Sequence, residues 1–181
     1  MTYEVPRVGI GVFIIRNKRD ILLGRRKNAH GDGEWAFPGG KQELNETVFE
    51  TANRELMEEC GPALKVAGHR ILCVGDMTFY PGKHFLDVGI ACTYVGGEPV
   101  VMEEDKCYEW KWFSMYSLPT PLFSSVNEYV EAHLWGKFYW NDRNLIATGE
   151  TKPSGLKDET ECPRDHSDNE QYPCHVCGAD V

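Results

Sequence analysis

Residues 39–61 read GGKQELNETVFETANRELMEECG, and this stretch decides both the expected fold and the expected chemistry. Thr47 followed three residues later by Glu50 is a capping-box pattern, which satisfies free backbone N–H groups at the start of a helix. Apolar side chains repeat every four residues and predict one inward-facing stripe: Val48, Ala52 and Leu56. Gly61 suits a left-handed position after the last turn. The pattern therefore predicts a helix from about Thr47 to Cys60.

Three glutamates crowd the last turns of this predicted helix: Glu55, Glu58 and Glu59. Their spacing places them within an arc of roughly 100°. Like charges at this spacing repel, and the helix dipole also disfavours anions in the last turn. Arg54 offsets part of the repulsion through an i,i+4 contact with Glu58, but one guanidinium does not neutralise three carboxylates. Clustered hard oxygen ligands suit Mg²⁺ or Mn²⁺, and a solvated acidic face is the alternative.

The wider pattern favours the metal site. Gly40, five residues, Glu46, seven residues and then RELMEECG (54–61) resembles the Nudix box, G-x5-E-x7-R-E-U-x-E-E-x-G-U, in which U is aliphatic. Every fixed position matches except the last, where this chain has Pro62. The resemblance implies an α/β fold, a Nudix-type α/β/α sandwich with a central mixed sheet, over a domain of residues 1–141.

The remaining elements are expected to follow the same order. Runs rich in apolar, β-branched and aromatic residues predict strands at residues 8–15, 21–26, 34–37, 69–80, 85–95 and 108–115. Helical spacing of Val126, Tyr129 and Val130, with His133 beside them, predicts a second helix within residues 124–138.

The Nudix resemblance also implies a reaction. Nudix enzymes use a divalent metal to hydrolyse a nucleoside diphosphate linked to another group. The implied ligands for Mg²⁺ or Mn²⁺ are Glu55, Glu58 and Glu59. One of these glutamates would help to deprotonate the attacking water, whose pKa the metal lowers. Arg54 would orient the glutamates, Gly40 would let the backbone approach them, and Glu46 would hold the loop by hydrogen bonds.

Members of this family often recruit another acid from a loop beyond the box. Three consecutive acids precede the strand-like segment YEWKWF (108–113): Glu103, Glu104 and Asp105. We expect Glu104 to take the catalytic role, and a solvated turn explains any one of the three equally well.

The chain as a whole resembles the branch of the family that cuts nucleoside triphosphates, including oxidised guanine nucleotides, to monophosphate and pyrophosphate. The segments behind this resemblance are RVGIGVFII (7–15), ILLGRRK (21–27), GEWAFPGGK (33–41) and EWKWF (109–113). The substrate contacts expected on this basis are Arg25, Trp35, Phe37, Gly39 and Gly40. Trp35 and Phe37 could stack on the base, while core packing is the alternative for Phe37. Arg25 and Arg26 could meet phosphates or lie on plain surface.

Other substrates remain open. No stretch resembles the SQPWPFPxS signature of the NADH-cleaving branch. Tyr80 and Pro81 lie near positions that mark cleavers of dinucleoside polyphosphates or ADP-ribose, so these compounds and nucleotide sugars are alternatives. Lys83 or His84, in the segment GDMTFYPGKHF (75–85), could touch substrate or lie in an ordinary hairpin turn. A non-catalytic Nudix module that binds a nucleotide or a partner protein is the alternative of another class, which the intact glutamate set disfavours.

Composition and charge limit the binding partners and the cellular location that we expect for this protein. A formal net charge of −9 argues against non-specific binding to nucleic acid or to an anionic membrane. No apolar run reaches the roughly 18 residues that span a bilayer, and the start lacks the basic region of a signal peptide, so we expect a cytoplasmic protein. Buried free thiols are expected at four cysteines: Cys60, Cys73, Cys92 and Cys107. The sequence leaves the oligomeric state open, with a homodimer as one candidate because homodimers are frequent among proteins of this type.

The character of the chain changes near Asn141, and residues 142–181 form a polar C-terminal tail. The tail carries four residues that could form a small zinc-binding knuckle: Cys162, His166, Cys174 and Cys177. His175 is an alternative fourth ligand. Structural Zn²⁺ would supply folding energy that this polar segment lacks. An unstructured tail with reactive thiols is the alternative.

Overall fold

The computed structural model describes residues 5–28, 30–78 and 82–142. The elements, in chain order, are β1 (Arg7–Arg16), β2 (Asp20–Arg26), β3 (Trp35–Ala36), β4 (Gly39–Lys41), α1 (Val48–Cys60), β5 (Lys65–Met77), β6 (Phe85–Gly96), β7 (Cys107–Ser114), α2 (Val126–Trp135) and β8 (Tyr139–Asn141). Both expected helices and all the expected strands are present. The short strands β4 and β8 were not predicted, because each is too short to carry a period-two pattern.

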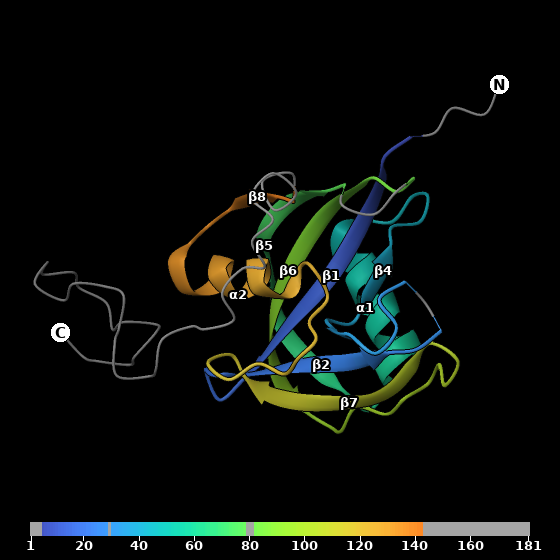
Figure 1. The fold of residues 1–181 in the computed structure, drawn as a ribbon. Helices are drawn as coiled ribbons and strands as arrows, with labels where there is room; N and C mark the ends of the chain where they lie inside the picture. The colour runs from blue at the N-terminus through green and yellow to red at the C-terminus, as the bar shows by residue number, and fades with distance from the viewer. Residues whose placement is uncertain (1–4, 29, 79–81, 143–181) are drawn as a thin grey trace, which may run out of the picture.

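The strands form one mixed sheet (Figure 1) in the order β3-β2-β1-β6-β5-β8, with β4 also paired to β1 and β7 to β2. The β1–β6 and β5–β8 pairs are parallel, and the other pairs are antiparallel. The parallel β1–β6 pair is central and joins Arg7–Ile15 to Phe85–Thr93 in continuous register. The predicted central mixed sheet is confirmed.

The two helices cover opposite faces of this sheet (Figure 1). Alternate residues of β1 explain the two layers, because successive side chains of a strand point to opposite faces. Ile10, Val12 and Ile14 belong to the core cluster that holds Ala52 and Leu56 of α1. Phe13 belongs to the other cluster, which holds the α2 residues Val126, Tyr129 and Val130. The α/β/α sandwich is confirmed, with one apolar core under each helix.

Helix α1 begins as predicted and ends differently. The Thr47 hydroxyl accepts a hydrogen bond from Glu50 N, and the Glu50 carboxylate accepts one from Thr47 N, which confirms the capping box. Gly61 has φ 83° and ψ 161°, so the expected left-handed conformation is wrong. Pro62 follows Gly61 and disfavours helical ψ there. The last carbonyls, of Glu59 and Cys60, instead accept from the backbone N–H groups of Met102 and Val100.

Several predictions concern the cysteines and the ends of the chain. Cys60, Cys73 and Cys92 are buried free thiols, as expected, whereas the free thiol of Cys107 is only half-buried. Among the described residues no helix is long and apolar enough to cross a membrane.

Asp142 is fully buried and accepts hydrogen bonds from Thr78, so the folded part of the chain extends at least to this residue. Some predictions lie outside the described residues, namely those for Tyr80 and Pro81 and for the zinc ligands Cys162, His166, Cys174, His175 and Cys177.

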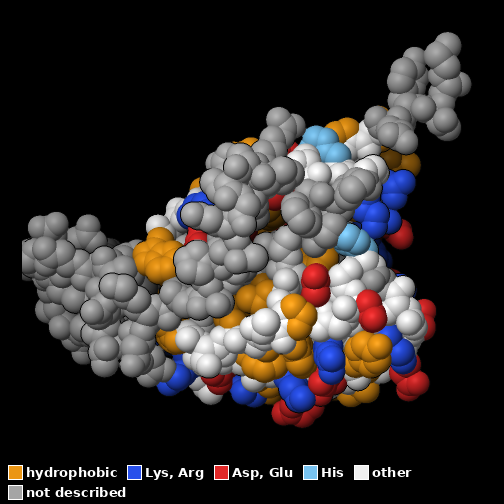
Figure 2. Space-filling model, viewed as in Figure 1, with side chains coloured by type: hydrophobic (Ala, Val, Ile, Leu, Met, Phe, Trp, Pro, Cys, Tyr) orange, Lys and Arg blue, Asp and Glu red, His pale blue; other side chains and the backbone are white. Residues whose placement is uncertain are grey.

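The surface carries both signs of charge. On the face shown in Figure 2, acidic and basic side chains are intermingled over the described part of the molecule, without a continuous basic surface.

Candidate metal and nucleotide site

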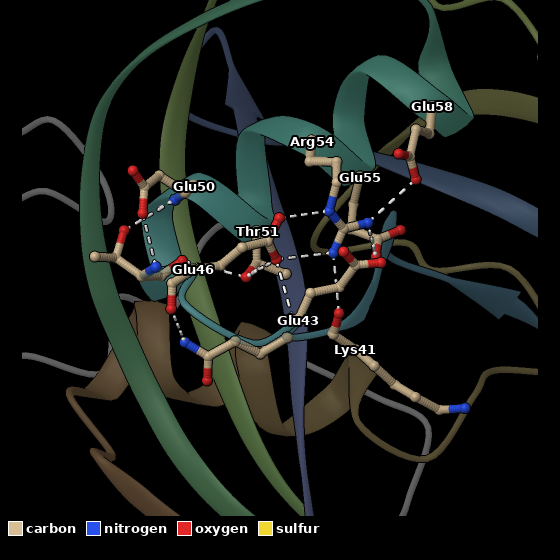
Figure 3. A network of polar contacts seen from close by, with 10 residues as sticks. Lys41, Glu43, Glu46, Glu50, Thr51, Arg54, Glu55 and Glu58 are labelled. Atoms are coloured by element: carbon tan, nitrogen blue, oxygen red, sulfur yellow. Dashed lines mark hydrogen bonds and ion pairs between the residues drawn. The ribbon is translucent and has the colours of Figure 1, made fainter.

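Arg54 is the centre of a polar network that joins helix α1 to the loop before it (Figure 3). Its Nε and Nη2 donate to the two carboxylate oxygens of Glu46 at 2.7 and 3.0 Å. Its Nη1 donates to Glu55 at 2.8 Å and to Glu58 at 3.1 Å, and its Nη2 also reaches the Lys41 carbonyl at 3.0 Å. One guanidinium therefore fixes the position of three glutamates and one strand end.

Glu46 holds the loop as expected. Besides Arg54, its Oε2 accepts from Glu43 N at 3.1 Å and from the Thr51 hydroxyl at 2.9 Å. The Glu46 carbonyl accepts from the Gln42 side chain. The hydrogen bonds from Arg54 lower the pKa of Glu46 to about 2, so this carboxylate stays ionised at neutral pH.

Gly40 is required by the position of the Glu55 carboxylate. A Cβ atom at residue 40 would overlap the Glu55 carboxylate, which therefore lies directly against the backbone of β4. Glu55 is 9% exposed, and this burial raises its pKa against the opposing effect of Arg54. The expectation that glycine lets the backbone approach a box glutamate matches this contact.

The backbone of Gly39 forms a hydrogen bond with a second box glutamate, Glu59. Its N–H donates to Glu59 Oε2 at 2.8 Å, and a Cβ at residue 39 would collide with the Ile10 carbonyl oxygen. The pKa of Glu59 is raised to about 8, mainly by burial; the charges of Glu55 and Glu103 contribute to this rise, and the Gly39 N–H opposes it. Two carboxylates of α1 thus lie against the two glycines of β4, in mutual repulsion.

The donor set fits a hard divalent cation. All the groups are carboxylate oxygens, which Mg²⁺ and Mn²⁺ prefer, and their charge exceeds what Arg54 neutralises. Within the described residues no three histidine, cysteine or acidic side chains converge closely enough to hold an ion. The reason is that Glu58 is turned to Arg54 and Glu59 to the Gly39 N–H. A cation would have to compete with these two partners.

Two of the acids considered beyond the box, Glu103 and Glu104, lie in different surroundings. Glu104 is exposed, and its backbone carbonyl accepts from Lys27 Nζ. Glu103 is half-buried, lines a small cavity of about 40 Å³ together with Glu59, and forms an ion pair with Lys106 at 2.7 Å. The turn at residues 103–107 is closed by hydrogen bonds from the backbone N–H groups of Lys106 and Cys107 to the Glu103 carbonyl. The geometry favours Glu103 over Glu104.

A cavity of about 770 Å³ adjoins the box at Gly39 and Gly40. We call it the basic cavity, because six basic residues line it: Arg7, Arg26, His30, Lys41, Lys83 and His84. Apolar and aromatic side chains form other parts of its wall, among them Phe37, Met77, Phe85 and Phe123. Asp87 is the one acid among the described residues of its lining. In a chain of net charge −9, this concentration of positive charge suits an anionic ligand.

The predicted substrate contacts divide into two groups. Phe37, Gly39 and Gly40 line the basic cavity. Trp35 does not: it is 8% exposed and packs edge-on against Phe113 at 4.7 Å between ring centroids. Arg25 is exposed and its guanidinium lies over the Tyr108 ring, whereas its neighbour Arg26 lines the basic cavity.

The sequence interpretation missed several residues of the site. Arg7, Lys41 and Asp87 had not been assigned to the site, and Tyr129 had been named only for its helical spacing. Lys83 and His84 line the cavity, which was one of the two alternatives proposed for them. The glycines of the GIG segment at residues 9–11 gave one signal, since they mark a place where side chains of other elements approach a strand.

Comparison with known proteins agrees with this geometry. Residues 5–133 match the family model of the NUDIX domain. The NAD-capped RNA hydrolase NudC of Pseudomonas putida is 29% identical over 126 residues, which are 69% of this chain and 44% of NudC. The oxidized purine nucleoside triphosphate hydrolase of Mus musculus is 31% identical over 109 residues, which are 60% of this chain and 66% of that protein. The chain thus spans less than half of NudC and about two thirds of the mouse protein.

Solved structures share the fold. A MutT NUDIX hydrolase from Burkholderia pseudomallei has a TM-score of 0.65 and 36% identity, covering 71% of this chain and 98% of that one. An ADP-ribose pyrophosphatase from Streptococcus suis has a TM-score of 0.56 at 23% identity, covering 76% of this chain and 100% of that one. The second likeness concerns the fold alone.

Proposed function

Because the chain belongs to the Nudix family, we propose that it is a metal-dependent pyrophosphohydrolase that cleaves a nucleoside triphosphate to nucleoside monophosphate and pyrophosphate. The observation that carries this proposal is the basic cavity, which adjoins the box glutamates through Gly39 and Gly40. Its volume of about 770 Å³ lies in the range of small-molecule sites. The four lysine and arginine side chains of the lining suit a chain of three phosphates better than the two phosphates of ADP-ribose or a nucleotide sugar.

We assign the metal to the carboxylates of Glu55, Glu58 and Glu59, with Mg²⁺ or Mn²⁺ as the ion. When bound, such an ion lowers the pKa of water and stabilises negative charge on phosphate oxygens. One of these glutamates takes the proton from the attacking water. Arg54 orients Glu55 and Glu58 through its Nη1, and Glu46 fixes Arg54 from the other side.

We place Glu103, instead of Glu104, in the role of the further acid. Its carboxylate lines the same small cavity as Glu59, and its charge raises the pKa of both Glu55 and Glu59. A fourth carboxylate there would ligate a second ion or hold a water that approaches the phosphorus. Lys106 is its ion-pair partner, and it positions the acid in the absence of an ion.

The proposal is tested by measuring which bond the protein cuts. The purified full chain with Mg²⁺ is given common and oxidised nucleoside triphosphates, ADP-ribose, a nucleotide sugar and a dinucleoside polyphosphate. Release of pyrophosphate and nucleoside monophosphate from a triphosphate is the expected result. Hydrolysis of ADP-ribose, nucleotide sugar or dinucleoside polyphosphate without any triphosphate cleavage would assign the site to the alternative substrate.

A substitution at Glu58 distinguishes a loss of catalysis from a loss of the fold. Glu58→Gln should abolish turnover and leave the fold intact, because Glu58 is exposed and amide replaces carboxylate at equal size. Glu98→Gln is the matched control, since Glu98 is an exposed acid between β6 and β7 that lines neither cavity. Equal activity in wild type and Glu58→Gln would refute the assignment of the site.

A further inference from the structure

Asp87 is a buried carboxyl in the wall of the basic cavity that the proposed chemistry does not use. It lies on β6, is 7% exposed and faces Gly9 of β1 in the parallel pair. Its Oδ2 accepts a hydrogen bond of 2.8 Å from the hydroxyl of Tyr129, which is fully buried on α2. Acids are seldom buried without a charged partner, so this position calls for an explanation.

Two glycines and Phe37 fix the position of Tyr129, the hydrogen-bond partner of the Asp87 carboxyl. A Cβ at Gly11 or Gly89 would run into the Tyr129 ring, so both glycines make room for this side chain. The Tyr129 ring stacks on Phe37, with 5.2 Å between centroids and an interplanar angle of 13°. Phe37 is itself part of the cavity wall. The Tyr129 hydroxyl therefore has a fixed position and orients the carboxyl beside the cavity.

One oxygen of Asp87 remains for a ligand. Tyr129 is the hydrogen-bond partner of this carboxyl among the described residues, and it uses Oδ2. Oδ1 would be 3.3 Å from a Cβ at Gly9, so glycine at residue 9 leaves the approach to Oδ1 open. A purely structural role for Asp87, as the anchor of Tyr129, would use one acceptor oxygen, Oδ2. Such a role does not require the second oxygen, Oδ1, in the cavity wall. A carboxyl oxygen in this low-dielectric position forms a strong hydrogen bond with an N–H donor.

We propose that Asp87 is a specificity-determining residue, which accepts a hydrogen bond through Oδ1 from the exocyclic amino group of the substrate's base. This inference rests on the proposed function, because it takes the basic cavity as the nucleotide site. The lysine and arginine side chains of the lining suit phosphates, whereas Asp87 is the one acid of the described lining and repels phosphates when it is ionised. Apolar walls from Phe37, Met77 and Phe85 suit a flat base better than a hydrated ribose.

The chemistry of the bases makes this assignment selective. An amino group extends beyond the ring and offers two N–H donors, as in guanine, adenine and cytosine. Uracil and thymine present carbonyl oxygens at the corresponding positions, and these would meet the carboxylate with like partial charge. A site that binds a polar group of its substrate rejects the analogue that lacks this group, because its own buried polar atom is left unpaired.

The test removes the amino group from the substrate and the carboxyl from the protein. GTP is compared with ITP, and ATP with purine riboside triphosphate, since each pair differs by one amino group without added bulk. Values of kcat/KM are measured for wild type, Asp87→Ala, Asp87→Asn and the control Glu98→Gln, after thermal unfolding has shown which variants fold. Wild type and Glu98→Gln should favour one amino-bearing member by about tenfold or more. In the Asp87 variants this ratio should fall below about threefold, with cleavage of the triphosphate retained.

Equal use of both members of each pair by wild type would overturn the inference, and this result requires no variant. A ratio that is unchanged in a folded Asp87 variant would also overturn it, while the proposed function would stand. If wild type cleaves no triphosphate, the proposed function fails by itself. The inference is then decided by calorimetric binding of GMP against IMP and of AMP against purine riboside monophosphate, where equal affinities would overturn it.

Discussion

Asp87→Asn should change how the stability of the protein depends on pH. Burial raises the pKa of Asp87 to about 7, from an ordinary value of 3.8 that applies in the unfolded chain. Between about pH 4 and pH 7 the folded protein therefore binds more protons than the unfolded chain, and the free energy of unfolding falls as pH rises. The contribution of the protonated carboxyl is complete below about pH 4 and lost above about pH 7. Asparagine does not titrate, so the variant lacks this slope.

The size of this change in the free energy of unfolding follows from the pKa shift of Asp87. Each unit of pKa difference corresponds to about 1.36 kcal/mol. From pH 5 to pH 7 the wild type should therefore lose at most about 2.7 kcal/mol relative to Asp87→Asn. For a chain of 181 residues, this loss equals roughly 5–10 °C in Tm. Asparagine keeps the size of the side chain and an acceptor for the Tyr129 hydroxyl, so the fold should persist.

Urea unfolding at pH 5, 6, 7 and 8 measures the effect, since the free energy of unfolding extrapolates linearly to zero denaturant. Other carboxyls titrate equally in both proteins and cancel in the difference. The stability of wild type minus that of the variant should fall by about 2 kcal/mol between pH 5 and pH 7 and level off above. A difference that stays constant, or rises with pH, would refute the reasoning that burial keeps Asp87 protonated.

Three further changes test the site. Arg54→Lys should lower kcat/KM by roughly 10–100-fold, because one ammonium cannot bridge the glutamates that the guanidinium joins. Arg70→Lys, at an exposed position of β5, is the control, and equal losses in both would contradict this role. Gly40→Ala should lower kcat/KM by about tenfold or more, since its methyl group would displace the Glu55 carboxylate, and circular dichroism should show an unchanged fold; full activity would mean that Glu55 need not lie there. Mg²⁺ at about one hundred times its Kd should stabilise EDTA-treated wild type by about 2.7 kcal/mol in thermal unfolding, and an equal gain in Glu58→Gln would exclude Glu58 as a ligand.

Local signals made helix α1 and its network predictable. The capping box at Thr47 and Glu50, the apolar stripe and the order of the box residues all act within one segment of about 20 residues. Interactions inside such a segment depend little on the rest of the chain. The Arg54–Glu58 contact could therefore be read from an i,i+4 spacing and is present in the structure.

The features that sequence reasoning missed depend on distant segments. The last carbonyls of α1 accept hydrogen bonds from Val100 and Met102, backbone donors about forty residues further along the chain. The pairing of β2 with β7 shifts register between Arg25 and Arg26, so neither arginine could be assigned to a face from β2 alone. The basic cavity collects residues from β1, β4 and the segment before β6. Only the assembled sheet brings these charges together.

The hydrogen bonds between the end of α1 and residues 100–102 restrict how the following loop can change in length. The Glu59 carbonyl accepts from Met102 N at 3.2 Å and from the Trp110 indole at 3.2 Å, so both flanks of the Glu103 turn are attached to the residue that Glu103 faces. Insertions at the exposed Gly97 and Glu98 would leave these attachments in place. An insertion between Met102 and Glu103 would move the acid away from Glu59, although the loop would remain closed.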